Sequence, residues 1–112
     1  MKFIIKSTKM KLSDSLKDYI KERIGSCQKY ININFPIMTR VEVEKTTEHH
    51  RKGKIFRAEV NIKLKDKFLR VEAVRDDIYL AINEVRDDLK RELKKHKEII
   101  VEKHHRSSKK YL

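Results

Sequence analysis

Residues 55–85 read IFRAEVNIKLKDKFLRVEAVRDDIYLAINEV and contain the clearest structural pattern in the chain. From Phe56 to Leu64, apolar and polar residues alternate, as they do in a strand with one face in a core and the other in solvent. The segment KDK predicts a turn, and FLRVEAV after it repeats the alternation. From Asp76 the apolar residues recur at helical spacing instead. This stretch therefore predicts two strands joined by a turn and followed by a helix.

The helix that begins near Asp76 is long and amphipathic. Its apolar residues fall in one narrow sector of a helical wheel; they are Ile78, Ile82, Val85, Leu89 and Leu93. We expect this helix to end near Lys97, which gives a length of roughly 30 Å at 1.5 Å per residue. After Val101, the segment EKHHRSSKKYL is polar, basic and without a period. We therefore expect a domain at 1–101 and a disordered basic tail at 102–112.

The N-terminal half predicts a strand, a helix and another strand. Residues 2–8 alternate, and Ser13 is a favourable N-cap for the helix after it, whose apolar stripe continues to Cys27. The only proline precedes TRVEVEKT at 39–46, which alternates again. The order β-α-β-β-β-α predicts an α+β fold: a two-layer sandwich with both helices on one face of a four-stranded sheet.

The chain is strongly basic, with a formal net charge of +12 over 112 residues and a pI of about 9.9. Such a protein gains by meeting a polyanion, and nucleic acid or an anionic membrane are the candidates. No run approaches the roughly 20 apolar residues of a spanning helix, and no secretory signal is evident at the N-terminus. We therefore expect a cytoplasmic protein that binds nucleic acid and no membrane.

Cations lie on both flanks of the apolar stripe of the last helix. One flank carries Tyr79, Asn83, Arg86, Lys90, Lys94 and Lys97, and the other carries Arg91 and Lys95. Helix-dipole and i,i+4 effects are worth only about 0.2–1 kcal/mol each, which does not explain an excess along the whole chain. Phosphate binding explains it better, because each neutralised phosphate releases counterions. Without a helix-turn-helix or zinc-finger motif, and with few aromatic residues, the target is expected to be a folded RNA recognised by shape.

Metal binding and catalysis have little support in the sequence. The pairs His49–His50 and His104–His105 are adjacent, so their side chains diverge, and a single cysteine adds little. The two glycines lie far apart, and no nucleophile motif is present. We therefore predict no metal, no cofactor, no catalytic residue and no enzymatic activity.

Three segments together resemble the ribosome hibernation promoting factor family, also called protein Y or ribosome-associated inhibitor. They are TKMKLSDSLKDYIKERI at 8–24, FRAEVNIKLKDKFLRVEAVRDDIYLAINEV at 56–85 and DLKRELKKHK at 88–97. The resemblance extends to about residue 100, and its most specific part is DDIYLAIN running into the basic helix. It implies a fold similar to double-stranded RNA-binding domains. It also implies binding of the small ribosomal subunit in the mRNA and tRNA channel, which would hold ribosomes idle under stress and in stationary phase.

The resemblance also implies a site on the two helices. The basic residues that recur in the family correspond to Lys17, Arg23, Lys29, Arg91, Lys94, Lys95 and Lys97, and the helical wheel adds Lys21, Arg86 and Lys90. These residues form the predicted rRNA-binding set. Asp88 and Ser26 depart from the pattern, because the family often has lysine at both positions. Arg23 has a second interpretation, in which its aliphatic stem covers the core.

Two further expectations follow from the resemblance and from the charge. Long members of the family carry an additional C-terminal domain that pairs ribosomes, so this chain, which ends at Leu112, resembles a short member and is expected to be a monomer off the ribosome. The alternative function is a general double-stranded RNA or tRNA binding module. A protein-interaction domain that uses its sheet face would differ from both in being indifferent to salt.

Overall fold

A computed structural model describes residues 1–31, 37–46 and 55–109. One sheet has the strand order β1-β2-β3-β4. Its strands are β1 (Lys2–Thr8), β2 (Met38–Thr46), β3 (Ile55–Lys63) and β4 (Phe68–Arg75). β1 pairs with β2 in parallel, whereas the other two pairs are antiparallel. A parallel pair needs a crossover connection, and the first helix provides it.

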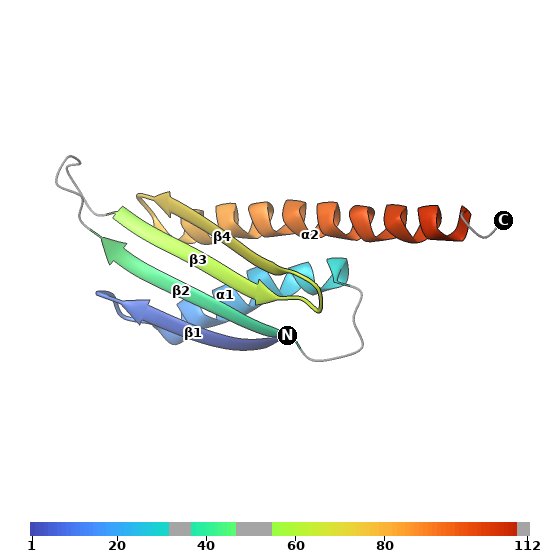
Figure 1. The fold of residues 1–112 in the computed structure, drawn as a ribbon. Coiled ribbons are helices and arrows are strands. Elements are labelled where there is room, and N and C mark those ends of the chain that lie inside the picture. Colours follow the sequence, from blue (N-terminus) through green and yellow to red (C-terminus); the bar gives the residue numbers. More distant parts are fainter. Residues whose placement is uncertain (32–36, 47–54, 110–112) are drawn as a thin grey trace.

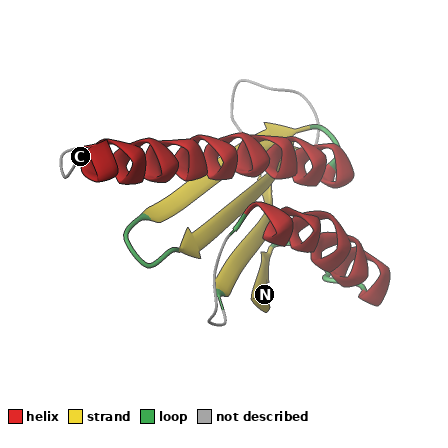
Figure 2. Cartoon of the chain, turned by 90° about the vertical axis from the view of Figure 1, so that its right-hand side faces the viewer, coloured by secondary structure: helices red, strands yellow, loops and turns green. Residues whose placement is uncertain are grey.

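The helices are α1 (Asp14–Gly25), the short 3₁₀ helix η1 (Ser26–Tyr30) and α2 (Ile78–Lys109). Both α-helices cover the same face of the sheet (Figures 1 and 2). The predicted order and the two-layer α+β sandwich are therefore confirmed. No helix in the described ranges is long and apolar enough to cross a bilayer.

Local side-chain contacts explain where α1 begins and where it tightens. The Ser13 hydroxyl accepts a hydrogen bond from the backbone N–H of Leu16 at 3.1 Å, as the N-cap prediction requires. At the other end, the Ser26 hydroxyl donates to the carbonyl oxygen of Arg23 at 2.6 Å. The chain then continues as η1, which ends at Tyr30. This turn of 3₁₀ helix carries Lys29 and Tyr30 alongside the middle of α2.

α2 begins after Asp77, whose carboxylate accepts from the backbone N–H of Tyr79 at 2.7 Å. It continues to Lys109, beyond the predicted end near Lys97, and so includes residues 102–109 of the segment that we expected to be disordered. Neither glycine nor proline follows residue 53, and helix propagation adds one hydrogen bond per residue. The 32 residues of α2 span about 48 Å, and the helix projects past the sheet (Figure 1).

The core lies between the helices and the sheet. The predicted apolar stripes of both helices are buried: Leu16, Ile20, Ile24, Cys27, Ile78, Ile82, Val85, Leu89 and Leu93. They pack on inward-facing side chains of the sheet such as Val43, Val60 and Ile62. Burial raises the pKa of the Cys27 thiol, and the nearby charge of Arg86 only partly opposes this. Cys27 is thus a small buried core residue, as we predicted.

The outer face of the sheet carries an ion-pair network around Arg57. Glu42, Glu59 and Glu72 lie opposite one another on three adjacent strands. Like charges in register are unfavourable, and Arg57 contacts all three as well as Glu44. Burial raises the pKa of Glu59, but hydrogen bonds from Asn61 and Arg57 and the charge of Arg70 outweigh burial and hold it below its usual value.

Candidate nucleic-acid interface

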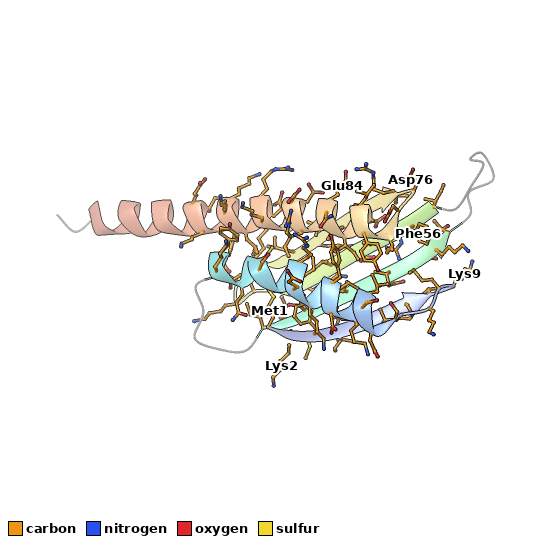
Figure 3. The ribbon with its side chains drawn as sticks, turned by 180° about the vertical axis from the view of Figure 1, so that it is seen from behind. Met1, Lys2, Lys9, Phe56, Asp76 and Glu84 are labelled. Atoms are coloured by element: carbon orange, nitrogen blue, oxygen red, sulfur yellow. The ribbon has the colours of Figure 1, made fainter. Side chains whose placement is uncertain are left out.

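The contacts between the two helices fix which flank of α2 faces α1. The rings of Tyr19 and Tyr79 meet edge to face, with centroids 4.9 Å apart, and the Tyr19 hydroxyl donates to Asn83 Oδ1 at 2.9 Å. Further along, the Cys27 thiol donates to the carbonyl oxygen of Arg86 at 3.7 Å. The partner of Cys27 lies later in α2 than the partner of Tyr19, so the chain advances in the same direction along both helices. The helices are therefore parallel (Figure 3). We call this line of contact the α1–α2 seam.

Arg23 lies in the seam. Its guanidinium carbon is 5.0 Å from the centroid of the Tyr19 ring, a distance at which a cation is attracted to the ring face. Its Nε is buried and has no hydrogen-bond partner among the described residues. The residue therefore both covers the helix contact and places a cation at the seam, so the two interpretations of Arg23 are compatible.

Three lysines surround Tyr30 at the end of η1. The Nζ atoms of Lys94, Lys29 and Lys90 lie 5.2, 5.3 and 5.6 Å from the centroid of its ring. Burial raises the pKa of the Tyr30 phenol, but its hydrogen-bonding interaction with Lys90 and the charges of Lys29 and Lys90 outweigh burial and hold the pKa below its usual value. No ion pair formed by the described residues involves any of the three lysines. We call these four residues the Tyr30 cluster.

The other predicted site residues of α2 lie around the Tyr30 cluster. Lys97 is exposed and follows Lys90 by seven residues, so it lies on the same flank of α2. The guanidinium of Arg86 pairs with its neighbour Asp87 at 2.9 Å. Arg91 is 74% exposed and pairs with Asp88 at 3.1 Å. Lys95 is exposed one turn beyond Arg91, on the flank away from α1.

Lys17 and Lys21 lie apart from the seam. Tyr19 and Arg23 mark the side of α1 that faces α2, and Lys21 is two residues from each, which is about 160° around the helix. Lys17 likewise lies about 160° from Tyr19. The structure therefore brings Arg23, Lys29, Lys90 and Lys94 to the seam and places Lys17 and Lys21 on the far side of α1.

Charge is also divided along the length of the helices. The first parts of α1 and α2, with the two residues before α2, carry Asp14, Asp18, Asp76, Asp77 and Glu84. Asp76 and Glu84 are labelled in Figure 3, well away from the projecting end of α2. The basic end, as we call it, contains Lys29, Lys90, Arg91, Lys94, Lys95 and Lys97. Because the helices are parallel, Lys29 after α1 and the lysines in the middle of α2 lie at the same end of the sheet.

Sequence reasoning missed part of this end. The His96 ring lies 3.1 Å from Asp66 Oδ1, which ties the β3–β4 turn to α2. The exposed Lys63, which ends β3, and Lys65 and Lys67 of that turn therefore lie at the basic end as well. Tyr30 was also missed, because nothing local to its sequence shows that Lys90 and Lys94 will reach it. Of the histidine pairs, His49–His50 and the side chains of His104–His105 lie outside the described residues.

The structure thus defines the class of the protein as a small, basic α+β sandwich domain with cations gathered on its helices. The sequence profile of the Sigma 54 modulation protein / S30EA ribosomal protein family matches residues 3–100, and the chain belongs to this family. Among curated relatives it is similar to the ribosome hibernation promotion factors of Lactococcus lactis, with 29% identity, and of Staphylococcus aureus, with 32% identity. Each match covers 87% of this chain and 50% or 48% of the relative, so the chain spans about half the length of these proteins.

Solved structures show the same fold. The N-terminal domain of Protein Y from Thermus thermophilus matches with a TM-score of 0.72 at 24% identity, covering 86% of this chain and 99% of that domain. A ribosomal subunit interface protein from Coxiella burnetii matches with a TM-score of 0.65 at 16% identity, covering 87% and 98%. At these identities the likeness bears on the fold alone.

Proposed function

We propose that this protein is a ribosome hibernation factor that binds rRNA of the small ribosomal subunit through its basic end. The observation that carries the proposal is the Tyr30 cluster, in which three cations converge without a described carboxylate partner. Such a group gains free energy when phosphates replace its counterions. The names of the curated relatives supply the ribosome as the source of those phosphates.

The proposed site is the predicted set of basic residues, ordered by their place in the structure. Arg23, Lys29, Lys90 and Lys94 form its centre at the seam. Arg86, Arg91, Lys95 and Lys97 extend it along α2, and Lys17 and Lys21 form an outlying part on α1. In this proposal the domain lies in the channel used by mRNA and tRNA, blocks translation, and preserves idle ribosomes in the cytoplasm during stress. It acts as a monomer, by occupancy and without catalysis.

Sedimentation through a sucrose gradient tests the binding surface. We expect the protein to migrate with small subunits and whole ribosomes at about 50 mM salt and to dissociate by about 200 mM. Lys90→Glu/Lys94→Glu should abolish comigration at the lower salt. Lys9→Glu/Lys11→Glu makes the same charge change at exposed lysines, and Lys9 is labelled in Figure 3 at the end of the sheet opposite the basic end. This control variant should still bind.

Two outcomes would count against the proposal. If both charge-reversal variants lose binding equally, the net charge of the chain matters and the basic end does not. If excess duplex RNA or tRNA displaces the protein from ribosomes as readily as free small subunits do, the chain is a general RNA-binding module. The channel has its own test: small subunits loaded beforehand with mRNA and initiator tRNA should not bind the protein, and simultaneous binding would place it elsewhere.

A further inference from the structure

The Tyr30 cluster joins side chains from two helices around one ring. Lys29 comes from η1, whereas Lys90 and Lys94 lie one turn apart on α2. All three Nζ atoms lie within 5.6 Å of the centre of the Tyr30 ring. Like charges gathered at this range repel one another. Something must offset this repulsion, or the flexible lysine side chains would spread apart into solvent.

We infer that Tyr30 is a positioning residue, whose ring holds these lysines together as a preformed site for one phosphate group of the RNA backbone. The inference rests on the proposed function and adds to it a residue that carries no formal charge. The face of an aromatic ring is negative, and it attracts an ammonium group within about 6 Å of its centroid. The ring is itself held in place, because Tyr30 is half-buried and packs against the core.

A phosphate fits this site better than a nucleobase does. Three ammonium groups already lie within 5.6 Å of the ring centre, where they would compete with a stacked base for the ring. Lysine binds phosphate as a point charge, and three such charges suit a group with several acceptor oxygens. The phenol hydroxyl adds a neutral donor at the same place.

A purely structural role for Tyr30 has to be separated from this one. Tyr30→Leu keeps an apolar side chain against the core but removes the ring, whereas Tyr30→Phe keeps the ring. Phosphate binding can be followed without any ribosome, by titrating inorganic phosphate at constant ionic strength and observing the Nζ resonances of the cluster lysines by NMR. Binding of a 16-base-pair RNA duplex, measured by fluorescence anisotropy, gives the second readout.

We expect phosphate to shift the cluster resonances in the wild type and in Tyr30→Phe, and to leave those of Tyr30→Leu unchanged. Duplex affinity should fall roughly three- to tenfold in Tyr30→Leu and be restored in Tyr30→Phe. Wild-type behaviour of Tyr30→Leu in both assays would overturn the inference. An equal loss in Tyr30→Phe would also overturn it, because the hydroxyl and not the ring would then be the active part.

Exposed lysines provide a test that does not depend on how Tyr30→Leu folds. Lys94→Gln should remove most of the phosphate response of the remaining cluster lysines, whereas Lys11→Gln, at an exposed lysine outside the proposed site, should leave it intact. An equal response in both variants would refute a defined site. If ribosome binding fails while phosphate still shifts these resonances, the proposed function is wrong and the site remains. If the protein binds ribosomes and Tyr30→Leu behaves as wild type, the proposed function stands and the phosphate site is wrong.

Discussion

Replacing Arg57 with methionine should destabilise the fold strongly, and the structure gives the size of the effect. The Arg57 side chain is only 18% exposed; its Nε lies 3.0 Å from Glu44 and one Nη lies 3.1 Å from Glu42, while the other contacts Glu59. Glu42 and Glu72 are more than a third exposed, so solvent screens their attraction to Arg57. The contacts that decide the cost are those with Glu44 and Glu59, which are 24% and 11% exposed.

Removing one partner of a buried ion pair costs about 3–5 kcal/mol when the other charge stays buried. Arg57 and its partners are only partly buried, so we expect Arg57→Met to lower the free energy of unfolding by about 3 kcal/mol near neutral pH. Urea unfolding followed by far-ultraviolet circular dichroism measures this value. The matched control is Arg70→Met on the same face, because Arg70 is 60% exposed and should cost less than about 1 kcal/mol.

The pH dependence gives a second check. The lowered pKa of Glu59 means that this carboxylate stabilises the wild type above the pKa of an unfolded glutamate, about 4.3, and that this contribution is lost as pH falls through the folded value. In Arg57→Met the crowded glutamates repel one another, so protonating them at low pH removes this repulsion and stabilises the variant. The difference in free energy of unfolding between the variant and the wild type should therefore shrink by at least half between about pH 7 and about pH 4.

Two results would refute this reasoning about Arg57. One is that Arg57→Met lowers the free energy of unfolding no more than Arg70→Met does. The other is a loss that does not change with pH, because the network would then stabilise through packing of the arginine stem and not through its charge. The double variant Arg57→Met/Glu59→Gln should recover at least about 1 kcal/mol, since it removes the stranded carboxylate together with its partner.

Three further predictions concern the helices. Leu89→Ala removes a fully buried side chain from α2 and should cost about 3 kcal/mol in urea unfolding; a cost below about 1 kcal/mol would mean that the helix is not packed as described. Asp77→Ala removes the carboxylate that accepts from Tyr79 N–H and should lower stability by about 1 kcal/mol, whereas Asp77→Asn should lose much less. Asp88→Asn frees Arg91 from its ion pair and should tighten ribosome binding several-fold at low salt, with no gain at high salt; unchanged sedimentation at low salt would remove Arg91 from the site.

The fold could be predicted because its signals are local. Alternation from Phe56 to Leu64 shows which face of β3 is buried, and the stripe from Ile78 to Leu93 does the same for α2. The end of α2 could not be predicted in this way. The stripe indicates which residues pack on the sheet, and a helix that continues into solvent needs no stripe, so α2 continues past Leu93 to Lys109.

The candidate site was less predictable, because a helical wheel does not show which flank meets a neighbour. The wheel grouped Lys90 and Lys94 correctly on one flank. Only tertiary contacts bring that flank to Tyr30, which lies some 60 residues earlier in the chain. The same limit applies to α1. Lys17 and Arg23 are both basic residues of one helix, yet their opposite placement depends on the position of α2.

Topology explains how basic residues of two helices can form one surface. Lys29 lies just after α1, whereas Lys90 and Lys94 lie near the middle of α2, too far from its end at Lys109 for the helix dipole to favour them. Here β1 is parallel to β2, and two antiparallel steps make β4 parallel to both. α1 follows β1 and α2 follows β4, so both helices return in the same direction. Lys29 at the end of η1 therefore meets Lys90 and Lys94 on α2, and residues some 60 positions apart in the sequence form one cationic cluster.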